Sequence, residues 1–384
     1  MSARDVAVVL GTRPEVIKLA PVIQRLRERA WVIHTGQHYD DALSGQFFRQ
    51  FDLPAPDVVL EGVGAQNRGT QISVALGKLT HLFTDNRPGA VVVQGDTNAV
   101  SSGAQAGQYL RIPVVHVEAG LRSQDRAMPE EINRLVAAVM AEVHCAPTER
   151  NATALRAEGI APERVVVTGN TVVEATLEAR SRPARRVATW FPNGTQPRRY
   201  AVATIHRPEN TDQPTALRRV LQGLRGLSVP VVFLAHPRTR KAIEQHGLGG
   251  LLDGLIVHEP PASTDFLALA ARATVLVSDS GGVQEECTVL KVPLAVIRRS
   301  TERPEAIEAG FAKLVPPEGD VASIVNAMIE DEGVRASVKH APSPYGDGQA
   351  SERIATIAGG LADGLAAPEA IARAMHPRGR GWAV

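Results

Sequence analysis

The sequence predicts an α/β protein built from two Rossmann-like domains. Short apolar runs rich in Val, Ile and Leu recur along the chain, and helix-like apolar spacing follows them. This alternation is typical of a parallel sheet covered on both faces. A length of 384 residues suits two domains of ~150 residues or more each. Because aromatic residues make up only 4% of the chain, we expect Val, Leu, Ile and Ala to form the core.

Each half of the chain contains several predicted strands. Those of the first half are Val6–Leu10, Trp31–Ile33, Ala90–Val93, Ile112–Val115 and Val165–Val167. Those of the second half are Tyr200–Ala203, Val231–Leu234, Leu255–Val257, Thr274–Val277 and Leu294–Ile297. Stretches 16–30 and 69–84 carry apolar residues at helical spacing and predict helices.

The stretch from Ser181 to Arg199 is rich in Pro, Gly and Arg and predicts a linker or a surface excursion. We therefore expect a first domain at 1–184, a second at 185–360 and a C-terminal tail at 361–384. Within that tail, residues from 366 onward end in a Gly/Arg/Pro-rich stretch and are expected to be poorly ordered.

Charge and cysteine content exclude several classes of protein. The net charge is +1, so we expect no general attraction to nucleic acid or to an anionic membrane, and any anionic ligand must be held locally. The N-terminus, Met-Ser-Ala-Arg-Asp, lacks the apolar stretch of a signal peptide, and no run approaches 18 uncharged apolar residues, so we expect neither a signal peptide nor a membrane span. The two cysteines, Cys145 and Cys287, exclude a disulfide scaffold and a CxxC-type metal site, and favour a cytoplasmic protein.

In open parallel sheets, ligands bind beyond the carboxyl ends of the strands, so the residues that follow each strand are the candidates for function. After the first strand come Arg13 and Lys18, either an anion site or exposed basic residues. Asp96, Glu118 and Glu130 follow later strands. Each alone is compatible with helix capping, but three clustered carboxylates favour acid/base chemistry. Strand alternation predicts that His116 and Glu118 share one side of the rim.

The second half repeats this arrangement. His206 and His236 end two of its strands. Each alone would be read as a packed or capping residue, but together they indicate a site. Ser280, Gly281 and Gly282 lie between a strand and an amphipathic run, which predicts a diphosphate-binding helix N-terminus. The pattern is neither a Walker A loop nor GxGxxG, so kinase and dinucleotide-binding functions lose support.

Ten ordered strings along nearly the whole chain resemble the UDP-N-acetylglucosamine 2-epimerase family, chiefly its non-hydrolysing type. The first-half strings are Gly-Thr-Arg-Pro-Glu at 11–15 with Lys18, Gln-His at 37–38, Gly-Asp-Thr at 95–97, His-Val-Glu-Ala-Gly-Leu-Arg at 116–122, Met-Pro-Glu-Glu-Ile-Asn-Arg at 128–134 and Thr-Gly-Asn-Thr-Val at 168–172. The second-half strings are His-Arg-Pro-Glu-Asn at 206–210, Asp-Ser-Gly-Gly-Val-Gln-Glu-Glu at 279–286, Thr-Glu-Arg-Pro-Glu at 301–305 and Pro-Tyr-Gly-Asp-Gly-Gln-Ala-Ser at 344–351.

The resemblance implies a glycosyltransferase-B-like architecture, in which two Rossmann-like domains face a cleft and the C-terminal helix crosses back to the first domain. It also implies reversible C2 epimerisation of UDP-N-acetylglucosamine to UDP-N-acetylmannosamine, by anti elimination of UDP to a 2-acetamidoglucal and re-addition. A UDP-sugar is the implied substrate and a homodimer the implied assembly. We expect no metal and no NAD to be required.

The resemblance also implies roles for individual residues. The implied catalytic set is Asp96, Glu118, Glu130 and His206. We expect Asp96 and Glu130 to be the acid/base pair and Glu118 to support the positive charge at the anomeric carbon. The implied substrate-binding set is Arg13, Lys18, His38, His236, Phe266, Ser280, Gly281, Gly282, Glu286 and Arg303. Within it, Glu286 would hold the ribose, Phe266 would border the uracil and Arg303 would hold the sugar.

Three positions depart from the family pattern: Glu174 stands for an Asp, Pro208 for a smaller or charged residue, and Lys291 lies in a turn that more often contains Gly. We expect Lys291 to adopt a positive φ. Four alternatives stay open: a hydrolysing 2-epimerase that releases UDP and N-acetylmannosamine, a 2-epimerase for a specialised sugar nucleotide, a glycosyltransferase of the same architecture, and a nucleotide-sugar sensor without chemistry.

Overall fold

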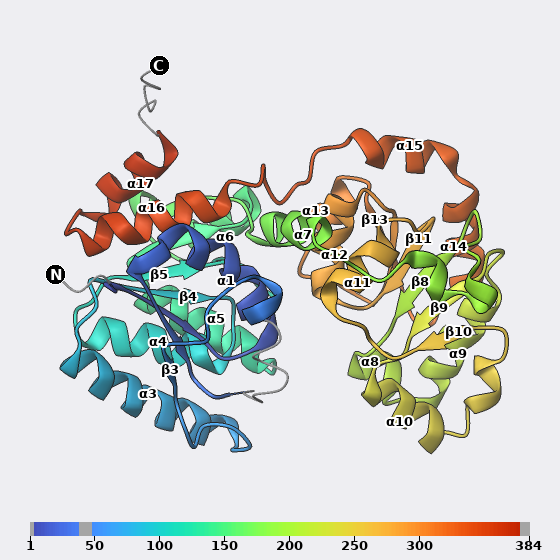
Figure 1. The fold of residues 1–384 in the computed structure, drawn as a ribbon, viewed down its shortest axis with the longest axis horizontal. Helices are drawn as coiled ribbons and strands as arrows, with labels where there is room; N and C mark the ends of the chain where they lie inside the picture. Colours follow the sequence, from blue (N-terminus) through green and yellow to red (C-terminus); the bar gives the residue numbers. More distant parts are fainter. Residues whose placement is uncertain (1–3, 38–47, 377–384) are drawn as a thin grey trace. The chain divides into compact units, whose positions relative to one another are not determined.

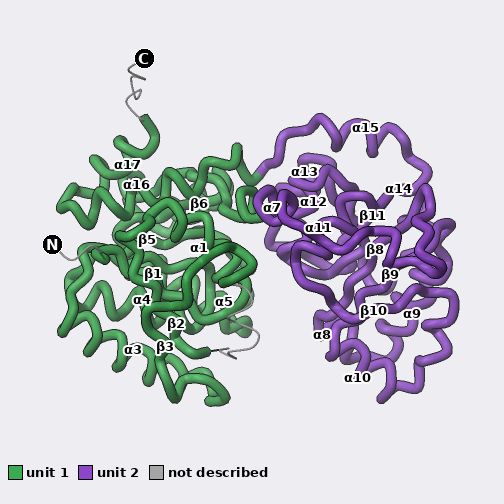
Figure 2. The backbone as a smooth tube through the Cα atoms, viewed as in Figure 1, with its two compact units in different colours: residues 1–175, 345–384 green, residues 176–344 purple. Residues whose placement is uncertain are grey.

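The computed structural model describes residues 4–37 and 48–376. The chain forms two compact units (Figure 2). Unit 1 comprises residues 1–175 and 345–384, and unit 2 comprises residues 176–344. Each unit contains its own parallel sheet, so the predicted two-domain α/β class is confirmed.

Unit 1 is built on a seven-stranded sheet of order β3-β2-β1-β4-β5-β6-β7, in which every pair is parallel. Its strands are β1 (Val6–Leu10), β2 (Ala30–His34), β3 (Val58–Val59), β4 (Ala90–Gln94), β5 (Val114–Val117), β6 (Val143–Ala146) and β7 (Val165–Val167). Its helices are α1 (Arg13–Leu26), α3 (Arg68–Asp85), α4 (Asn98–Tyr109), α5 (Pro129–Met140), α6 (Glu149–Ala157), α16 (Ala350–Ala362) and α17 (Ala367–Met375).

Unit 2 is built on a six-stranded parallel sheet of order β10-β9-β8-β11-β12-β13. Its strands are β8 (Ala201–Thr204), β9 (Val231–Leu234), β10 (Ile256–His258), β11 (Val275–Ser278), β12 (Leu294–Ile297) and β13 (Ala312–Val315). Its helices are α8 (Pro208–Thr211), α9 (Pro214–Arg225), α10 (Pro237–Gln245), α11 (Ser263–Ala270), α12 (Gly281–Leu290), α13 (Glu305–Glu308), α14 (Val321–Glu330) and α15 (Glu332–His340); α7 (Val172–Ser181) spans the boundary between the units.

The central strands consist mainly of apolar residues, as expected where helices cover both faces of a sheet. In unit 1, Val9 and Val93 of the sheet belong to a core that includes residues of α3 and α4. The helices α1 and α16 contact the same sheet (Figure 1). All five residues of β1 are fully buried. The expectation of a core built from small aliphatic side chains is thereby met.

All ten predicted strands are present, four with the predicted ends and six with ends shifted by one or two residues, and the described residues contain three further strands that were not predicted. The strand β3 has only two residues. The strand β6 has the sequence Val-His-Cys-Ala. His144 and Cys145 interrupt the run of aliphatic residues by which a buried strand is recognised in a sequence. The strand β13 contains the exposed Lys313, as an edge strand permits.

The observed boundaries differ from the expected 1–184, 185–360 and 361–384. The predicted linker packs on unit 2, because Trp190 and Phe191 are buried there in edge-on contacts with His258 and Tyr200. The chain crosses between units near 175 and again near 344. The expected disorder from residue 366 is wrong as far as residue 375, since α17 occupies 367–375 and packs against α16.

The C-terminal helices return to the first unit, as expected. Arg29 of unit 1 donates to Asp5 at 2.6 Å and to Asp363, just after α16, at 2.9 Å. Glu174 accepts from the backbone N–H of Ser351 at 2.7 Å, so this departure from the family pattern retains a structural contact. Lys291 has φ 61° and ends α12, which confirms the predicted positive φ. Within the described residues, no helix combines the length and apolarity needed to span a bilayer.

Candidate active site

The strand order of both sheets reverses at one point, between β1 and β4 in unit 1 and between β8 and β11 in unit 2. Loops that leave neighbouring strands in opposite directions open a crevice at the carboxyl edge of a parallel sheet, where ligands bind. The sequence-predicted residues lie mainly on the loops and first helical turns beyond these strands. The two units are described separately below.

Glu118 lies directly after β5 and is held by a cation from α1. Lys18 Nζ donates to both carboxylate oxygens of Glu118, at 2.8 and 2.7 Å, and Gln94 Nε2 donates at 2.5 Å. Glu118 has φ 62°, which turns its backbone out of the strand and costs energy in a residue with a side chain. It therefore does not continue the strand alternation with His116, and the predicted shared side is wrong.

His116 is instead buried beneath the next loop. Its Nε2 donates to the carbonyl of Gly95 at 2.8 Å. Burial lowers the pKa of His116 to about 4, so the ring is neutral near pH 7. This hydrogen bond fixes the loop that carries Asp96.

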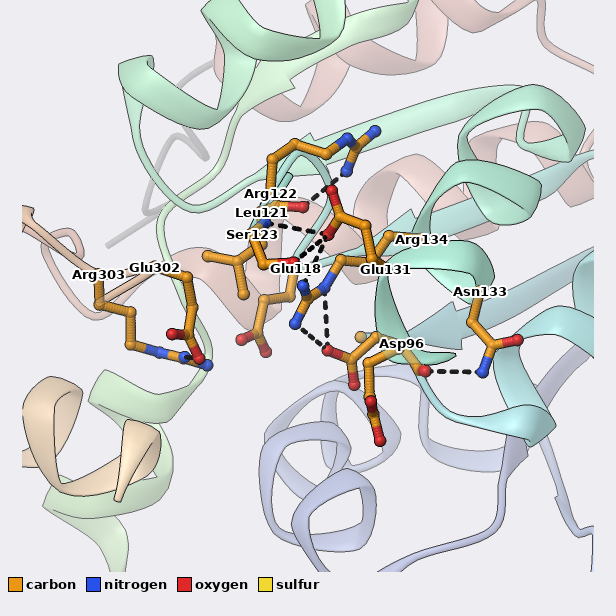
Figure 3. Close-up of polar contacts among 12 residues, drawn as sticks. Asp96, Glu118, Leu121, Arg122, Ser123, Glu131, Asn133, Arg134, Glu302 and Arg303 are labelled. Carbon is orange, nitrogen blue, oxygen red and sulfur yellow. Dashed lines mark hydrogen bonds and ion pairs between the residues drawn. The ribbon is translucent and has the colours of Figure 1, made fainter. Parts of the chain in front are cut away.

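Asp96 is bound from α5 by an arginine that the sequence analysis did not identify. Arg134 donates to Asp96 Oδ2 through Nε at 3.0 Å and Nη2 at 2.5 Å (Figure 3), and its Nη1 donates to Glu131 at 2.9 Å. Asn133 Nδ2 binds the carbonyl of Asp96 at 3.0 Å (Figure 3). The Asp96 side chain keeps 28% exposure, so a carboxylate with a fixed orientation still reaches solvent.

The two adjacent glutamates of α5 have different environments. The Glu130 side chain is 45% exposed, 3.8 Å from Arg68. Glu131 is buried and accepts from the backbone N–H groups of Ser123 and Gln124. Burial opposes its ionisation, but these bonds and Arg134 hold the pKa of Glu131 below its usual value. Glu131 therefore has a structural role, and Glu130 is the glutamate available to a ligand.

Glu15 is a second residue that the sequence analysis did not select. It is 1% exposed and accepts from the Gly11 N–H at 3.0 Å, Thr12 Oγ1 at 2.8 Å and Thr97 Oγ1 at 2.8 Å. Burial raises the pKa of Glu15 to about 7, and these hydrogen bonds only partly oppose the shift. Glu15 thus connects the loop after β1 to the loop after β4, next to Asp96.

Arg13 and His38 are the two other residues of unit 1 that were predicted to bind the substrate. Arg13 is exposed at the start of α1. His38 lies outside the described residues. Its neighbour Gln37 accepts through Oε1 from the backbone N–H of Ala99, at 3.2 Å.

In unit 2, a buried aspartate organises the loop that carries His206. Asp279 is 0% exposed and accepts from the backbone N–H groups of His206 and Arg207, from Asn210 Nδ2 at 2.9 Å and from His206 Nδ1 at 3.0 Å. Burial opposes its ionisation, but these partners keep the pKa of Asp279 below its usual value. The motif Asp-Ser-Gly-Gly contains this residue, but a sequence alone does not show its link to His206.

His236 lies close to His206, with ring centroids 5.8 Å apart. Its Nδ1 accepts from the Arg238 backbone N–H at 3.2 Å and so caps α10. Burial, assisted by His206, lowers the pKa of His236. Both the capping role and the grouping with His206 are therefore present.

The predicted diphosphate seat lies at the start of the ten-residue helix α12. Ser280 is its N-cap and makes no side-chain capping bond, which leaves the first N–H groups of the helix directed outward. Arg303 lies against this turn, because a Cβ placed on Gly281 would be 2.7 Å from Arg303 Nη1. Arg303 is fixed by Glu285 Oε1 at 2.8 Å and Glu302 Oε1 at 2.9 Å.

Glu302 is a further residue not identified from sequence. It binds Arg298 at 2.8 Å and Arg303 at 2.9 Å. Burial opposes its ionisation, yet these arginines hold the pKa of Glu302 at about 2. Glu286 on α12 and Phe266 on α11 are each partly buried. In the described ranges, no three His, Cys, Asp or Glu side chains are grouped to hold a metal ion.

Comparisons with known proteins show which family the chain belongs to. The family model described as UDP-N-acetylglucosamine 2-epimerase matches residues 24–358. The UDP-GlcNAc 2-epimerase of Methanocaldococcus jannaschii, solved in complex with UDP-GlcNAc and UDP, is 36% identical with a TM-score of 0.78, over 91% of this chain and 98% of that chain. The Neisseria meningitidis UDP-GlcNAc 2-epimerase bound to UDP-GlcNAc is 32% identical with a TM-score of 0.81, over 90% and 97%.

A relative with a different named substrate is similar over a comparable length. The UDP-2,3-diacetamido-2,3-dideoxy-D-glucuronate 2-epimerase of Pseudomonas aeruginosa is 32% identical over 361 residues, which cover 90% of this chain and 97% of the relative. The family model spans most of the chain and includes both strand-end clusters, apart from the loop after β1 and the residues of α1 before residue 24. This chain belongs to the UDP-N-acetylglucosamine 2-epimerase family.

Proposed function

We propose that this chain interconverts UDP-N-acetylglucosamine and UDP-N-acetylmannosamine without releasing free sugar. The observation that carries the proposal is the pair of carboxylates, Asp96 and Glu118, at the ends of adjacent strands, each fixed by its own cation. The substrate named for the Methanocaldococcus and Neisseria relatives gives further support.

The proposed reaction begins with cleavage of the bond between C1 and the diphosphate oxygen, while a carboxylate removes the C2 proton. The products are 2-acetamidoglucal and UDP. UDP then adds back to C1 as C2 is protonated on the opposite face. The C2 proton is weakly acidic, because the acetamide is attached through nitrogen and provides no enolate. Departure of the diphosphate therefore runs ahead of proton removal, and positive charge develops at C1.

The geometry of unit 1 supports separate roles for its carboxylates in stabilising charge and in transferring the proton. Glu118, in contact with Lys18 and Gln94, is placed to stabilise positive charge rather than to exchange protons. Asp96 and Glu130 both keep exposed carboxylates, so we assign them as the acid/base pair. In unit 2, the N–H groups of Gly281 and Gly282, together with Arg303 and His206, would stabilise negative charge on the diphosphate.

Proton exchange with solvent tests this function. The protein is incubated with UDP-N-acetylglucosamine in D₂O and the products are followed by NMR. We expect deuterium at C2 in both UDP-linked sugars. Free N-acetylmannosamine with UDP would instead establish a hydrolysing enzyme, and absence of both exchange and turnover would reject 2-epimerisation of this substrate.

Variants test the assignment of the acid/base pair. Asp96→Asn and Glu130→Gln should each reduce C2 exchange by at least about 100-fold while UDP binding, measured by calorimetry, changes little. Glu149→Gln is the matched control, because Glu149 is also a first-turn glutamate of a unit 1 helix. Turnover retained in both test variants would refute the assignment.

A second candidate is 2-epimerisation of a more highly modified UDP-sugar. The similarity to the Pseudomonas enzyme, which is named for a diacetamido uronate, favours this candidate specifically. The same D₂O assay with that UDP-uronate decides between them: exchange with the uronate and none with UDP-N-acetylglucosamine would replace the first proposal by the second.

A further inference from the structure

A cavity of about 630 Å³ lies within unit 2, and we call it the basic basin. Its lining comes from segments far apart in the sequence. The lining residues are Arg198, Arg199, Ala271, Arg272, Ala273, Thr274, Lys291, Val292, Pro293, Glu332, Arg335 and Lys339.

The basic basin and the proposed diphosphate seat occupy opposite edges of the six-stranded sheet. Thr274 and Pro293 directly precede β11 and β12, whereas Ser280 and Arg303 follow these strands. Four strand residues span ~13 Å at 3.3 Å per residue. A ligand in the basin is therefore separate from one bound at the start of α12.

The basin carries a large excess of positive charge. Six of its lining residues are Arg or Lys, and Glu332 is the one acidic residue among them. Arg198, Arg272 and Lys339 are exposed, and no carboxylate within the described ranges forms an ion pair with any of the three. Arg199 is paired with Glu330 at 2.9 Å and Arg335 with Glu332 at 3.5 Å. The remaining cations repel one another unless an anion joins them.

Structural roles account for the other three cations. Arg199 and Arg335 donate to the carbonyl of Ile329, at the end of α14, and Lys291 Nζ donates to the carbonyl of Ala341 at 2.7 Å. Cations favour helix C-termini in this way. These contacts fix three side chains at the rim but leave Arg198, Arg272 and Lys339 without such a role.

We propose that the basic basin binds a small ligand that carries two or more phosphate groups. Two of the three cations without a structural role, Arg198 and Arg272, are arginines, whose planar guanidinium groups bind phosphate oxygens in pairs. The volume lies within the range of small-molecule sites and exceeds what one phosphate fills. The cations also come from four segments around the cavity, as a ligand with several anionic groups requires.

Lysine footprinting tests this site independently of the catalytic reaction. The full chain is acetylated with and without inorganic tripolyphosphate, and the modified lysines are quantified by mass spectrometry. We expect saturating tripolyphosphate to slow acetylation of Lys339 roughly tenfold. Lys313 is the internal control, because it is exposed on β13 of the same unit and does not line the basin.

A pair of double variants locates the effect. Arg198→Ala/Arg272→Ala should abolish the protection of Lys339. Arg218→Ala/Arg225→Ala should leave it unchanged, since this control removes two exposed arginines from α9 of the same unit. Equal protection of Lys313 and Lys339, protection that survives in the basin variant, or no protection would overturn the proposal. Stronger protection by a single-stranded oligonucleotide than by tripolyphosphate would also overturn it and assign the basin to nucleic acid.

Discussion

At the scale of single residues, the protonation of Glu15 is linked to folding. Its folded-state pKa of about 7 lies above the ordinary value of 4.5 because the carboxyl group is buried. The folded protein therefore holds this proton more tightly than the unfolded chain does. The resulting stabilisation is complete below about pH 4.5 and is lost as the pH rises toward 7, by up to about 3 kcal/mol.

Glu15→Gln should remove this contribution to the pH dependence. Between pH 5 and pH 8, the free energy of unfolding should fall less in the variant than in the wild type. Urea denaturation at four pH values measures the difference, with the exposed unit 1 glutamate substitution Glu163→Gln as the control. Parallel pH profiles for wild type and Glu15→Gln would contradict the assigned shift.

The two glycines of the proposed diphosphate seat differ in the space around them. A Cβ on Gly281 would be 2.7 Å from Arg303 Nη1, whereas a Cβ on Gly282 has no contact nearer than 3.9 Å. Gly281→Ala must therefore displace Arg303, whose guanidinium is held by Glu285 and Glu302. We expect Gly281→Ala to weaken UDP binding about tenfold or more, which corresponds to ~1.4 kcal/mol.

Gly282→Ala is the matched control for this substitution, with an expected change in UDP affinity of less than about threefold. Calorimetric titration with UDP measures both variants. Equal losses in the two would show that close approach of the ligand to the backbone, rather than the position of Arg303, accounts for the glycines.

The sequence identified candidate site residues that follow strands, but it did not identify the residues that hold those side chains in place. Asp96 and Glu118 were found because they follow strands in distinctive strings. Arg134 and Asp279 were not, because each acts through a partner many residues away, 38 residues for Arg134 and Asp96 and 73 for His206 and Asp279. Such pairings depend on which strands are neighbours.

At the scale of secondary-structure elements, α4 approaches its sheet closely at Gly103. A Cβ at this position would lie 2.9 Å from Val93 Cγ1 and 3.1 Å from Val9 Cγ1, and both valines are fully buried in central strands. Alanine favours helices by up to 1 kcal/mol over glycine, but overpacking against stiff β-branched side chains costs about 1–3 kcal/mol. We expect Gly103→Ala to destabilise the protein by ~1 kcal/mol or more.

Gly77→Ala on α3 separates the two effects. Gly77 is exposed and an added Cβ meets nothing within 4 Å, so we expect this variant to be stabilised by about 0.5–1 kcal/mol. Thermal and urea unfolding of both variants measure the contrast. Stabilisation by Gly103→Ala would show that α4 moves away from the sheet at little cost.

Strands and helices were predicted correctly where their own residues form a recognisable apolar pattern. Most of the buried interior strands are largely apolar runs, and these were found. The strand β6 contains His144 and the edge strand β13 contains Lys313. These two strands were missed because such residues join a sheet only through pairing with neighbouring strands. The helix α17 was missed because its buried face consists of alanines, Ala367, Ala370 and Ala374, which give a weak apolar signal in the sequence.

At the scale of the whole molecule, each unit has a sheet and a core of its own, and we assign the diphosphate to unit 2 and the sugar chemistry to unit 1. Hydrogen exchange followed by mass spectrometry tests this division. UDP alone should slow amide exchange at 206–210 and 279–283, because bound ligand opposes local opening. UDP-N-acetylglucosamine should in addition slow exchange at 95–98 and 116–123.

Asp96→Asn is the control variant for this assignment of the two units. In this variant, UDP should still slow amide exchange in unit 2. Protection by UDP confined to unit 1 would reverse the assignment of the two units.

The sequence by itself determined the α/β class, ten strand positions, the family resemblance and the positive φ of Lys291, because these depend on residues close together in the chain. Only the tertiary structure decided which charged groups meet. Lys18 and Glu118 are 100 residues apart, and they meet because the sheet of unit 1 is ordered with β4 between β1 and β5. Strand propensity is local, whereas strand order and the burial of a charge are properties of the assembled sheet.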